Sequence, residues 1–227
     1  MKVKLISYST PSEELCTQGL EDCQDLIAYC ARVSNPSNQM NTETSEQLLN
    51  YLAKHKHWSP FEMVNVCLEI ETTRDIARQI LRHRSFTFQE FSQRYADPTK
   101  DFDFVTREAR LQDSKNRQNS IPIDESDPKQ VSTAYMWERM QENLIQTVSN
   151  YYTWAIDRGI AKEQARALLP EGLTMSRMYV NGTLRSWIHY CELRSANGTQ
   201  AEHAQIAIEC SKVISEVFPS IGVYTSE

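Results

Sequence analysis

Apolar and polar residues alternate most regularly in the segment VNVCLEIE, residues 64–71. Every second residue there is Val, Leu or Ile, and the residues between them are polar or small. A period of two is typical of a strand that buries one face. The sequence therefore predicts a strand in this segment. Shorter apolar runs predict further strands at Met1–Tyr8, Phe102–Val105 and Met175–Val180.

Other segments carry apolar residues at helical spacing. Thr44–Lys54 has leucines on one side and begins with Thr44 and Gln47, which have the spacing of a capping box. The longest helical pattern runs from Val131 to Arg158 and ends before Gly159, a residue suited to a helix C-terminus. The same reasoning predicts a helix that ends near Ala31 and helices at Thr73–Leu81, Ala161–Leu168, Leu184–Arg194 and Gln200–Val217.

Strands and helices are mixed along the whole chain. Arg110–Gln130 is polar and contains two prolines, which predicts a long surface loop and not a linker between domains. We find no internal repeat and no low-complexity tract. A chain of 227 residues is within the range of one domain. The sequence therefore predicts a single domain of mixed α/β (α+β) class over residues 1–227.

The charge balance narrows the class of function. The formal net charge is −6, with a pI of about 5.5, whereas proteins that bind nucleic acid or anionic membranes in general are basic. We therefore expect neither nucleic acid nor a membrane as partner. No apolar run approaches the 18 or so residues of a membrane span, and the first residues lack the apolar core of a signal peptide. Cytoplasmic location is the expectation.

The six cysteines are spaced for free thiols. Cys16, Cys23 and Cys30 recur every seven residues, as on one stripe of a helix, where neighbours lie roughly 10 Å apart. That distance exceeds the reach of a disulfide. There is no CxxC pair, and the five histidines lack the spacing of a zinc site. We therefore expect buried thiols in a reducing compartment, and no metal.

A cationic cluster stands out in this acidic chain. The segment RHRSFTFQEFSQRY, residues 82–95, contains three arginines, one histidine and a single carboxylate. One interpretation is an exposed helix end, where cations gain about 0.3–1 kcal/mol from the helix dipole. The other is an anion-binding pocket. If Gln89–Tyr95 is extended, Glu90, Ser92 and Arg94 share one side, and their donors suit a phosphate. The residues alone leave both interpretations open.

Several motifs resemble those of the flavin-dependent thymidylate synthases (the ThyX type). Arg82-His83-Arg84, followed after seven residues by Ser92, resembles the RHR-x7-S signature of that family. Other segments resemble family motifs in the family's order, between about residues 31 and 202. They are HWSPFE (57–62), Gln79, RALLP (166–170), LRSW (184–187), LR (193–194) and QAE (200–202).

The resemblance implies a function and an architecture. Members make dTMP from dUMP, with 5,10-methylenetetrahydrofolate as one-carbon donor, FAD as hydride carrier and NADPH as reductant. The fold implied is a central, mostly antiparallel sheet flanked by helices, in a homotetramer with shared active sites.

The resemblance also implies the site residues. Those expected to contact FAD are Ser59, Arg82, His83, Arg84, Glu90, Thr183, Arg185 and His189. Those expected to contact dUMP are Gln79, Arg82, Glu90, Ser92, Arg94, Arg166 and Arg194.

Arg194 is the residue implied to be catalytic. C5 of uracil is a poor nucleophile until negative charge builds at N3 and the carbonyls, and a fixed guanidinium stabilises that charge as it develops. The chain departs from the family pattern at Thr183, where many members carry Asn, and at Gly198, where some carry His. Both departures concern contacts to the flavin.

Two other functions compete with this one. A nucleotide- or RNA-binding protein without catalysis could use the same cations, but the acidic charge and the lack of an aromatic stacking motif weigh against it. A folate-dependent methyltransferase without flavin would need neither FAD nor NADPH. For Ser92, a nucleophile would need a base within about 3 Å, so binding of phosphate or uracil is the favoured role.

Overall fold

Four antiparallel strands form the centre of the molecule. The computed structural model describes residues 1–220. The strands lie in the order β1 (Lys2–Tyr8), β2 (Asn65–Thr73), β6 (Met175–Thr183) and β3 (Thr87–Glu90). Each neighbouring pair is antiparallel. The predicted mixed α/β class and the antiparallel sheet are therefore confirmed, as are the strands at residues 1–8, 64–71 and 175–180 in outline.

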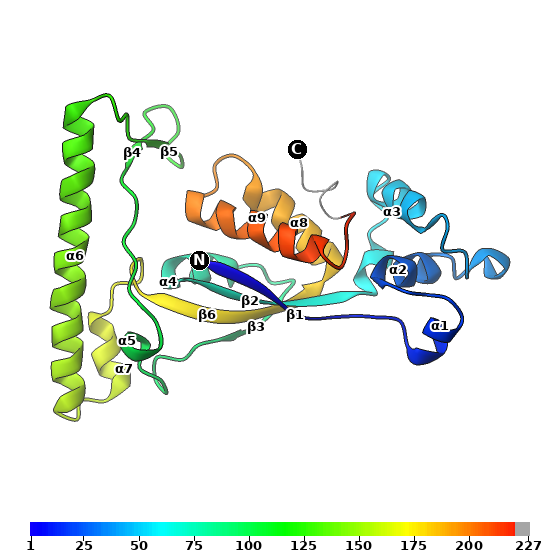
Figure 1. Cartoon of the computed structure of the whole chain (residues 1–227), viewed down its shortest axis with the longest axis horizontal. Coiled ribbons are helices and arrows are strands. Elements are labelled where there is room, and N and C mark those ends of the chain that lie inside the picture. The colour runs from blue at the N-terminus through cyan, green and yellow to red at the C-terminus, as the bar shows by residue number, and fades with distance from the viewer. Residues whose placement is uncertain (221–227) are drawn as a thin grey trace.

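The sheet has one buried and one open face. Val66, Leu68 and Ile70 of β2 are at most 1 % exposed. On the other face, Glu69 and Glu71 both form ion pairs with Arg177 of β6. This is the arrangement that the period of two in β2 predicts. In Figure 1, helices cover the apolar face. They are α4 (Arg74–Ile80), α8 (Leu184–Ser195) and α9 (Ala201–Ser215).

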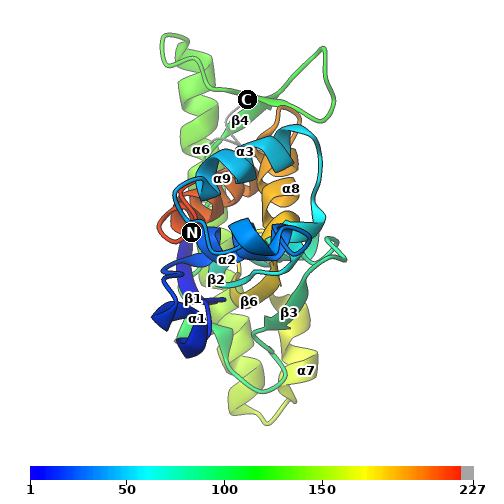
Figure 2. The ribbon, with the colours of Figure 1, turned by 90° about the vertical axis from the view of Figure 1, so that its right-hand side faces the viewer.

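Short N-terminal helices lie at one end of the sheet. Figure 2 shows them at the front, where α2 and α3 pack near the start of β2. Ile27 and Ala28 of α2 and Leu49 of α3 are fully buried in the same core as the sheet. The elements of this region are α1 (Glu13–Thr17), α2 (Cys23–Ala31), the short 3-10 helix η1 (Pro36–Asn38), α3 (Ser45–Lys54) and a second 3-10 helix, η2 (Ser59–Glu62).

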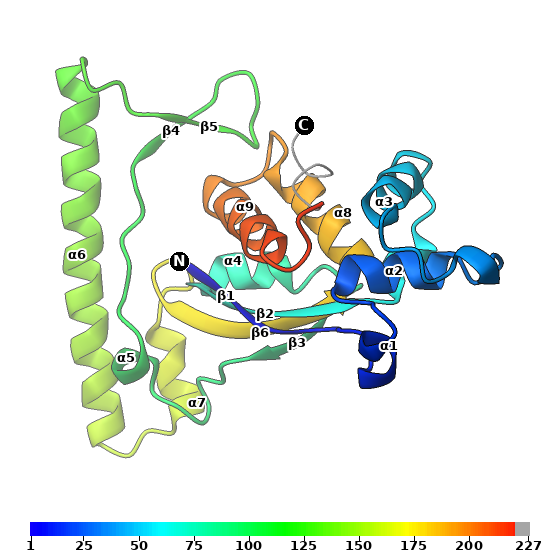
Figure 3. The same cartoon turned by 45° about the vertical axis from the view of Figure 1, so that its right-hand side comes forward.

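The helix α6 (Pro128–Asp157) stands at the opposite end of the molecule, as Figures 1 and 3 show. Its second half packs against α7 (Lys162–Ala165) and the 3-10 helix η3 (Arg166–Leu168) through a small separate core around Tyr152 and Ala155. The long helix predicted before Gly159 is confirmed, and Gly159 has a φ of 78°. Neither α6 nor any other helix of the described residues is long and apolar enough to cross a membrane.

Two predicted local structures are wrong. Residues 102–105 form only an isolated bridge between Phe104 and Thr174, next to the short helix α5 (Pro98–Asp101). The predicted loop at 110–130 contains a hairpin of β4 (Arg110–Gln112) and β5 (Ser120–Pro122). The apolar run at 102–105 indicates a strand, but only Phe104 finds a partner strand residue, at Thr174. Apolar residues are few at 110–130, so the local pattern gave little signal for the hairpin that forms there.

The capping box at Thr44 is also wrong, although the helix that follows it is confirmed as α3. The Thr44 side chain makes no bond to the helix backbone. Its Oγ1 instead accepts a hydrogen bond of 2.8 Å from Arg32, at the end of α2. A guanidinium from a neighbouring element has therefore replaced the local cap.

All six cysteines are free, as the sequence predicts. The continuous stripe of three is wrong, because a break separates α1, which holds Cys16, from α2, which holds Cys23 and Cys30. Cys16 is exposed. Burial is full for Cys23, Cys191 and Cys210 only.

Candidate functional site

The Arg-His-Arg segment leaves the end of α4 in a pair of tight turns. The amide of His83 donates to the carbonyl of Ile80 at 3.0 Å, and the amide of Phe86 donates to the carbonyl of His83 at 3.2 Å. Phe86 is buried, with its ring 4.5 Å from that of Trp187. A Cβ on Gly182 of β6 would lie 2.2 Å from the Phe86 ring. Glycine at this position therefore lets Phe86 anchor the segment.

Arg82 and Arg84 extend from this anchored segment into solvent. Within residues 1–220 neither guanidinium takes part in an ion pair or a hydrogen bond, whereas Arg74, Arg107 and Arg177 are all paired with carboxylates. Two unpaired guanidinium groups on a rigid turn are suited to a phosphate or another anion, which can accept several of their donors.

Arg194 and His83 are in direct contact. The Nε of Arg194, on α8, donates to Nε2 of His83 at 2.8 Å. A ring nitrogen that accepts carries no proton, so this bond requires neutral His83. Burial, followed by the nearby Arg194 cation, lowers the pKa of His83 to about 4, which agrees with that state. The bond fixes Arg194 through its Nε and leaves its two terminal nitrogens for a ligand.

A second histidine lies behind this pair. His203 of α9 is fully buried, and its two ring nitrogens are 3.1 Å from the Tyr190 hydroxyl and 3.1 Å from Oε1 of Gln79. The rings of Tyr190 and His83 are 4.9 Å apart. The structure thus brings together Gln79, His83 and Arg194, three of the sequence-predicted site residues.

Sequence reasoning missed His203. It falls on the stripe of α9 that also contains Ile206, Cys210 and Ile214, all buried. A histidine on an otherwise apolar stripe was the signal that could have identified it.

Both histidines make the stability of the fold sensitive to acid. Burial and the Arg194 cation also lower the pKa of His203 to about 4, below the value of about 6.5 of an unfolded histidine. The unfolded chain then binds protons more readily, so the free energy of unfolding should fall as pH is lowered from about 6.5 toward 4. Denaturant unfolding at several pH values measures this. The fall should be smaller in His203→Leu; an equal fall would contradict the prediction.

A second group of predicted residues meets where η2 contacts α8. A terminal nitrogen of Arg185 donates to Oε1 of Glu62 at 2.6 Å. The ring of His189 is nearly perpendicular to that of Trp58, with 4.7 Å between the ring centres. Trp58 directly precedes Ser59 in the sequence. Burial, and then the Arg185 cation, lowers the pKa of His189.

Thr183 lies at the N-terminus of α8. Its Oγ1 accepts from the amide of Ser186 at 3.3 Å and caps the helix. The hydroxyl groups of Thr183 and Ser186 are also 3.1 Å apart, so both serve the helix start in this structure.

The helix α8 presents Arg185 and Arg194 in opposite directions. Nine residues separate them, which is a rotation of about 180° in an α-helix. Their partners agree, because Arg185 contacts Glu62 of η2 whereas Arg194 contacts His83 after α4. The two arginines therefore belong to different surfaces of one helix.

The predicted row of Glu90, Ser92 and Arg94 does not form. Pairing of β3 with β6 stops at Glu90, and after one more backbone bond from Phe91 the chain turns, with the amide of Tyr95 donating to the carbonyl of Ser92 at 3.1 Å. The extended segment at 89–95 on which that row depends is therefore absent, because the chain turns at Ser92 although β6 continues to Met175.

Glu90 lies in a cluster of its own. Its carboxylate is 3.6 Å from Arg74 and 3.3 Å from Arg78, and it accepts from the Ser176 hydroxyl at 3.2 Å. Its side chain is only 17 % exposed. These contacts neutralise Glu90 within the chain.

Arg94 and Arg166 lie at the far end of β3 from the Arg-His-Arg segment. Arg94 pairs with Glu163 of α7 at 3.3 Å, and Arg166 begins η3 directly after α7. At roughly 3.3 Å per residue, the extended stretch from Thr87 to Phe91 alone is about 13 Å long. Within one chain, the predicted site residues are thus distributed over separate places.

Comparisons with known proteins agree on one family. Residues 15–220 match the family model described as "Thymidylate synthase complementing protein". The chain is 48 % identical over 222 residues to a probable flavin-dependent thymidylate synthase of Paramecium bursaria Chlorella virus 1, with 98 % of this chain and 97 % of the relative covered. It is 45 % identical over 225 residues to the flavin-dependent thymidylate synthase of Synechocystis sp., with 98 % of each covered.

A solved structure shares the fold. The crystal structure of a UMP/dUMP methylase from Streptomyces cacaoi, bound with 5-Br dUMP, superposes with a TM-score of 0.75 at 21 % identity. The match covers 98 % of this chain and 93 % of the other. The likeness concerns the arrangement of helices and strands.

Proposed function

Because this chain belongs to the flavin-dependent thymidylate synthase family, we propose that it methylates dUMP to dTMP. The one-carbon donor is 5,10-methylenetetrahydrofolate, FAD is the hydride carrier and NADPH is the reductant. The observation that supports this most directly is the position of Arg194, held through Nε by a neutral His83.

Arg194 is the residue we assign to the chemistry. It is half-buried, and within residues 1–220 it has no carboxylate partner. His83 and His203 beside it are neutral at neutral pH, so Arg194 is the cation of this cluster. Placed at the uracil N3 and its carbonyls, the guanidinium stabilises the negative charge that makes C5 nucleophilic. Because the side chain is already fixed, little reorganisation is needed when that charge develops.

The residues present fit FAD. Its pyrophosphate needs cationic donors that no carboxylate has neutralised, and Arg82 and Arg84 meet that condition. Ser59, His83, Glu90, Thr183, Arg185 and His189 complete the proposed set of FAD contacts. When bound, FAD supplies the hydride, and the protein orients the partners.

Arg166, Arg94 and Ser92 form the proposed phosphate end of the dUMP site, with Gln79, Arg82, Glu90 and Arg194 nearer the pyrimidine. Arg166 has no ion pair within the described part of the chain. Arg94 pairs with Glu163, but both side chains are about half exposed. Such surface ion pairs contribute about 0–1 kcal/mol to stability. A nucleotide phosphate can therefore displace Glu163 from Arg94 at small cost.

We propose a homotetramer with active sites shared between subunits. The distribution of the site residues over separate surfaces of one chain supports it, since residues of neighbouring chains would complete each group. Exposed positions along α6 support it too, because many of them carry large apolar residues. They are Val131, Tyr135, Met136, Trp137, Met140, Leu144, Tyr151 and Trp154.

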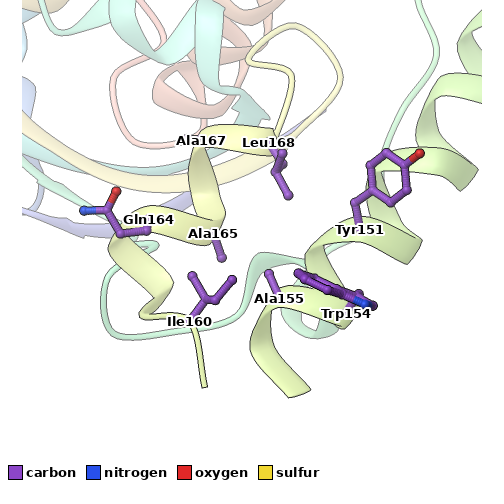
Figure 4. A pocket seen from close by; sticks show the side chains of 8 residues that line it. All are labelled: Tyr151, Trp154, Ala155, Ile160, Gln164, Ala165, Ala167 and Leu168. Carbon is purple, nitrogen blue, oxygen red and sulfur yellow. The ribbon is translucent and has the colours of Figure 1, made fainter. Parts of the chain in front are cut away.

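A hollow beside α6 gives a second copy a place to pack. It has a volume of about 500 Å³ and lies between Trp154 of α6, Ile160 and Leu168 of η3, as Figure 4 shows. None of its lining residues is a predicted ligand contact, but Arg166 lies between two of them, Ala165 and Ala167, in the chain. Contiguous apolar patches of this kind mark protein interfaces. Assembly on this face would bring Arg166 next to a neighbouring subunit.

We further propose that the chain forms a single domain and works in the cytoplasm. The family match extends over residues 15–220, which supports one domain. All six cysteines are free thiols, the state that a reducing compartment maintains.

An omission assay tests the function. Conversion of dUMP to dTMP should occur with FAD, NADPH and 5,10-methylenetetrahydrofolate together and should stop when any one is left out. Turnover that continues without FAD and NADPH would indicate a methyltransferase that uses folate alone. A protein that ignores FAD but binds RNA with a steep dependence on salt would indicate the RNA-binding alternative.

A further inference from the structure

We propose that His203, held by Tyr190, is a positioning residue that fixes which way the Gln79 amide faces and so lets the enzyme distinguish uracil from cytosine. This inference rests on the proposed function, in which Gln79 contacts the pyrimidine of dUMP. His203 itself is buried and reaches the ligand only through Gln79.

The amide is part of a continuous chain of hydrogen bonds. It runs from Glu202 through Gln200, Gln79 and His203 to Tyr190, with distances of 2.9, 2.8, 3.1 and 3.1 Å. Glu202 is itself fixed by Arg107, 3.0 Å away. These hydrogen bonds therefore link the half-buried side chain of Gln79 to the buried side chains of His203 and Tyr190.

The Glu202 end of this series of hydrogen bonds sets its polarity. The Glu202 carboxylate can only accept, so Gln200 must turn its amide nitrogen toward it and its oxygen toward Gln79. Gln79 then donates from Nε2 and presents Oε1 to Nδ1 of His203, which must carry the proton.

The Tyr190 end is compatible with this polarity, because a hydroxyl can donate or accept. Nε2 of His203 is left to accept from the Tyr190 hydroxyl, 3.1 Å away. Burial raises the pKa of Tyr190 well above its ordinary value, so the hydroxyl keeps its proton and can donate.

A fixed amide has consequences for base recognition. A primary amide has two N–H groups and two lone pairs on its oxygen. The hydrogen bonds to Gln200 and His203 use one of each on Gln79. The unused donor and acceptor remain in a set order. Uracil presents an acceptor at C4 and a donor at N3, whereas cytosine presents a donor at C4 and an acceptor at N3. An amide held one way favours uracil, and the reversed amide favours cytosine.

The test compares substitutions at His203. His203→Leu removes the donor but keeps an apolar side chain in the core, so the KM for dUMP should rise by up to about tenfold, with kcat less affected. Inhibition by dCMP should become stronger relative to dUMP binding. His203→Asn places an amide N–H near the position of Nδ1 and should restore most of the discrimination. FAD absorbance and thermal unfolding check that each variant is folded.

A merely structural role for His203 gives a different pattern. Leucine would then leave the preference for dUMP over dCMP unchanged, or asparagine would fail to restore it, and either result would overturn the proposal. Should His203→Leu not fold, Tyr190→Phe provides the test, since it removes the hydroxyl that donates to Nε2 of His203 and so favours the proton on Nδ1. It should weaken the preference for dUMP, and an unchanged preference would overturn the proposal.

Gln79→Ala separates this inference from the function on which it rests. In a chain that already carries Gln79→Ala, the further substitution His203→Leu should change neither the KM for dUMP nor the preference for dUMP over dCMP. If the wild-type protein turns over dUMP but Gln79→Ala has a normal KM and a normal preference for dUMP, the inference fails while the function stands. If the wild-type protein does not turn over dUMP at all, the proposed function itself fails.

Discussion

Arg194→Ala should slow the dUMP-dependent reoxidation of the reduced flavin by about a hundred- to a thousandfold, the usual effect of removing one donor that stabilises developing charge. The physical reason is that the guanidinium is needed only when negative charge builds on the uracil. Reduction of the flavin by NADPH involves no uracil anion and should proceed at nearly the wild-type rate. Stopped-flow measurement of the two half-reactions separates these effects.

Arg194→Lys should recover little of this loss. Lysine keeps the positive charge, but it lacks the Nε group through which Arg194 is bound to His83 and the planar arrangement of donors. Its ammonium group would therefore not be held in place. Equal slowing of both half-reactions in either variant would mean that Arg194 supports the fold or the FAD site instead. Arg117→Ala is the matched control, because Arg117 is exposed on the β4–β5 hairpin and its guanidinium makes no ion pair or hydrogen bond within residues 1–220.

The central strand and most helices could be predicted because their signals are local. In β2 a single face is buried, so the alternation of Val66, Leu68 and Ile70 with polar residues records the fold directly. The segment after Glu90 lacks such a record. The chain turns at Ser92 although β6 continues to Met175, and the alternation of residue types after Glu90 does not indicate that turn.

The residues of the candidate site were predicted by resemblance, but their grouping was not. The contact between His83 and Arg194 joins residues 111 positions apart, and no periodicity predicts it. The opposite directions of Arg185 and Arg194 could have been predicted, since nine residues on a helix make about two and a half turns. The ion pairs of Glu90 could not, because they depend on α4 and β3 meeting across β6.

Arg166→Ala and Arg194→Ala should each be nearly inactive alone but should restore activity when they assemble into one tetramer. If a site takes Arg194 from one subunit and Arg166 from another, random mixing in equal amounts leaves about a quarter of the sites with both arginines. If both come from the same subunit, no mixed assembly contains an intact site. Co-expression with two affinity tags isolates the mixed tetramers, and light scattering verifies their size.

The matched control is the wild-type chain co-expressed with the double variant Arg166→Ala/Arg194→Ala. A site within one subunit predicts about half of the wild-type activity from this mixture, whereas a shared site predicts about a quarter. The two mixtures should therefore have similar activity if sites are shared and very different activity if they are not. An active monomer, or a mixture of the single variants that stays inactive while the control reaches half, would contradict the shared site. The separation of Arg166 beside α7 from Arg194 beside α4 is what makes restoration the expected result.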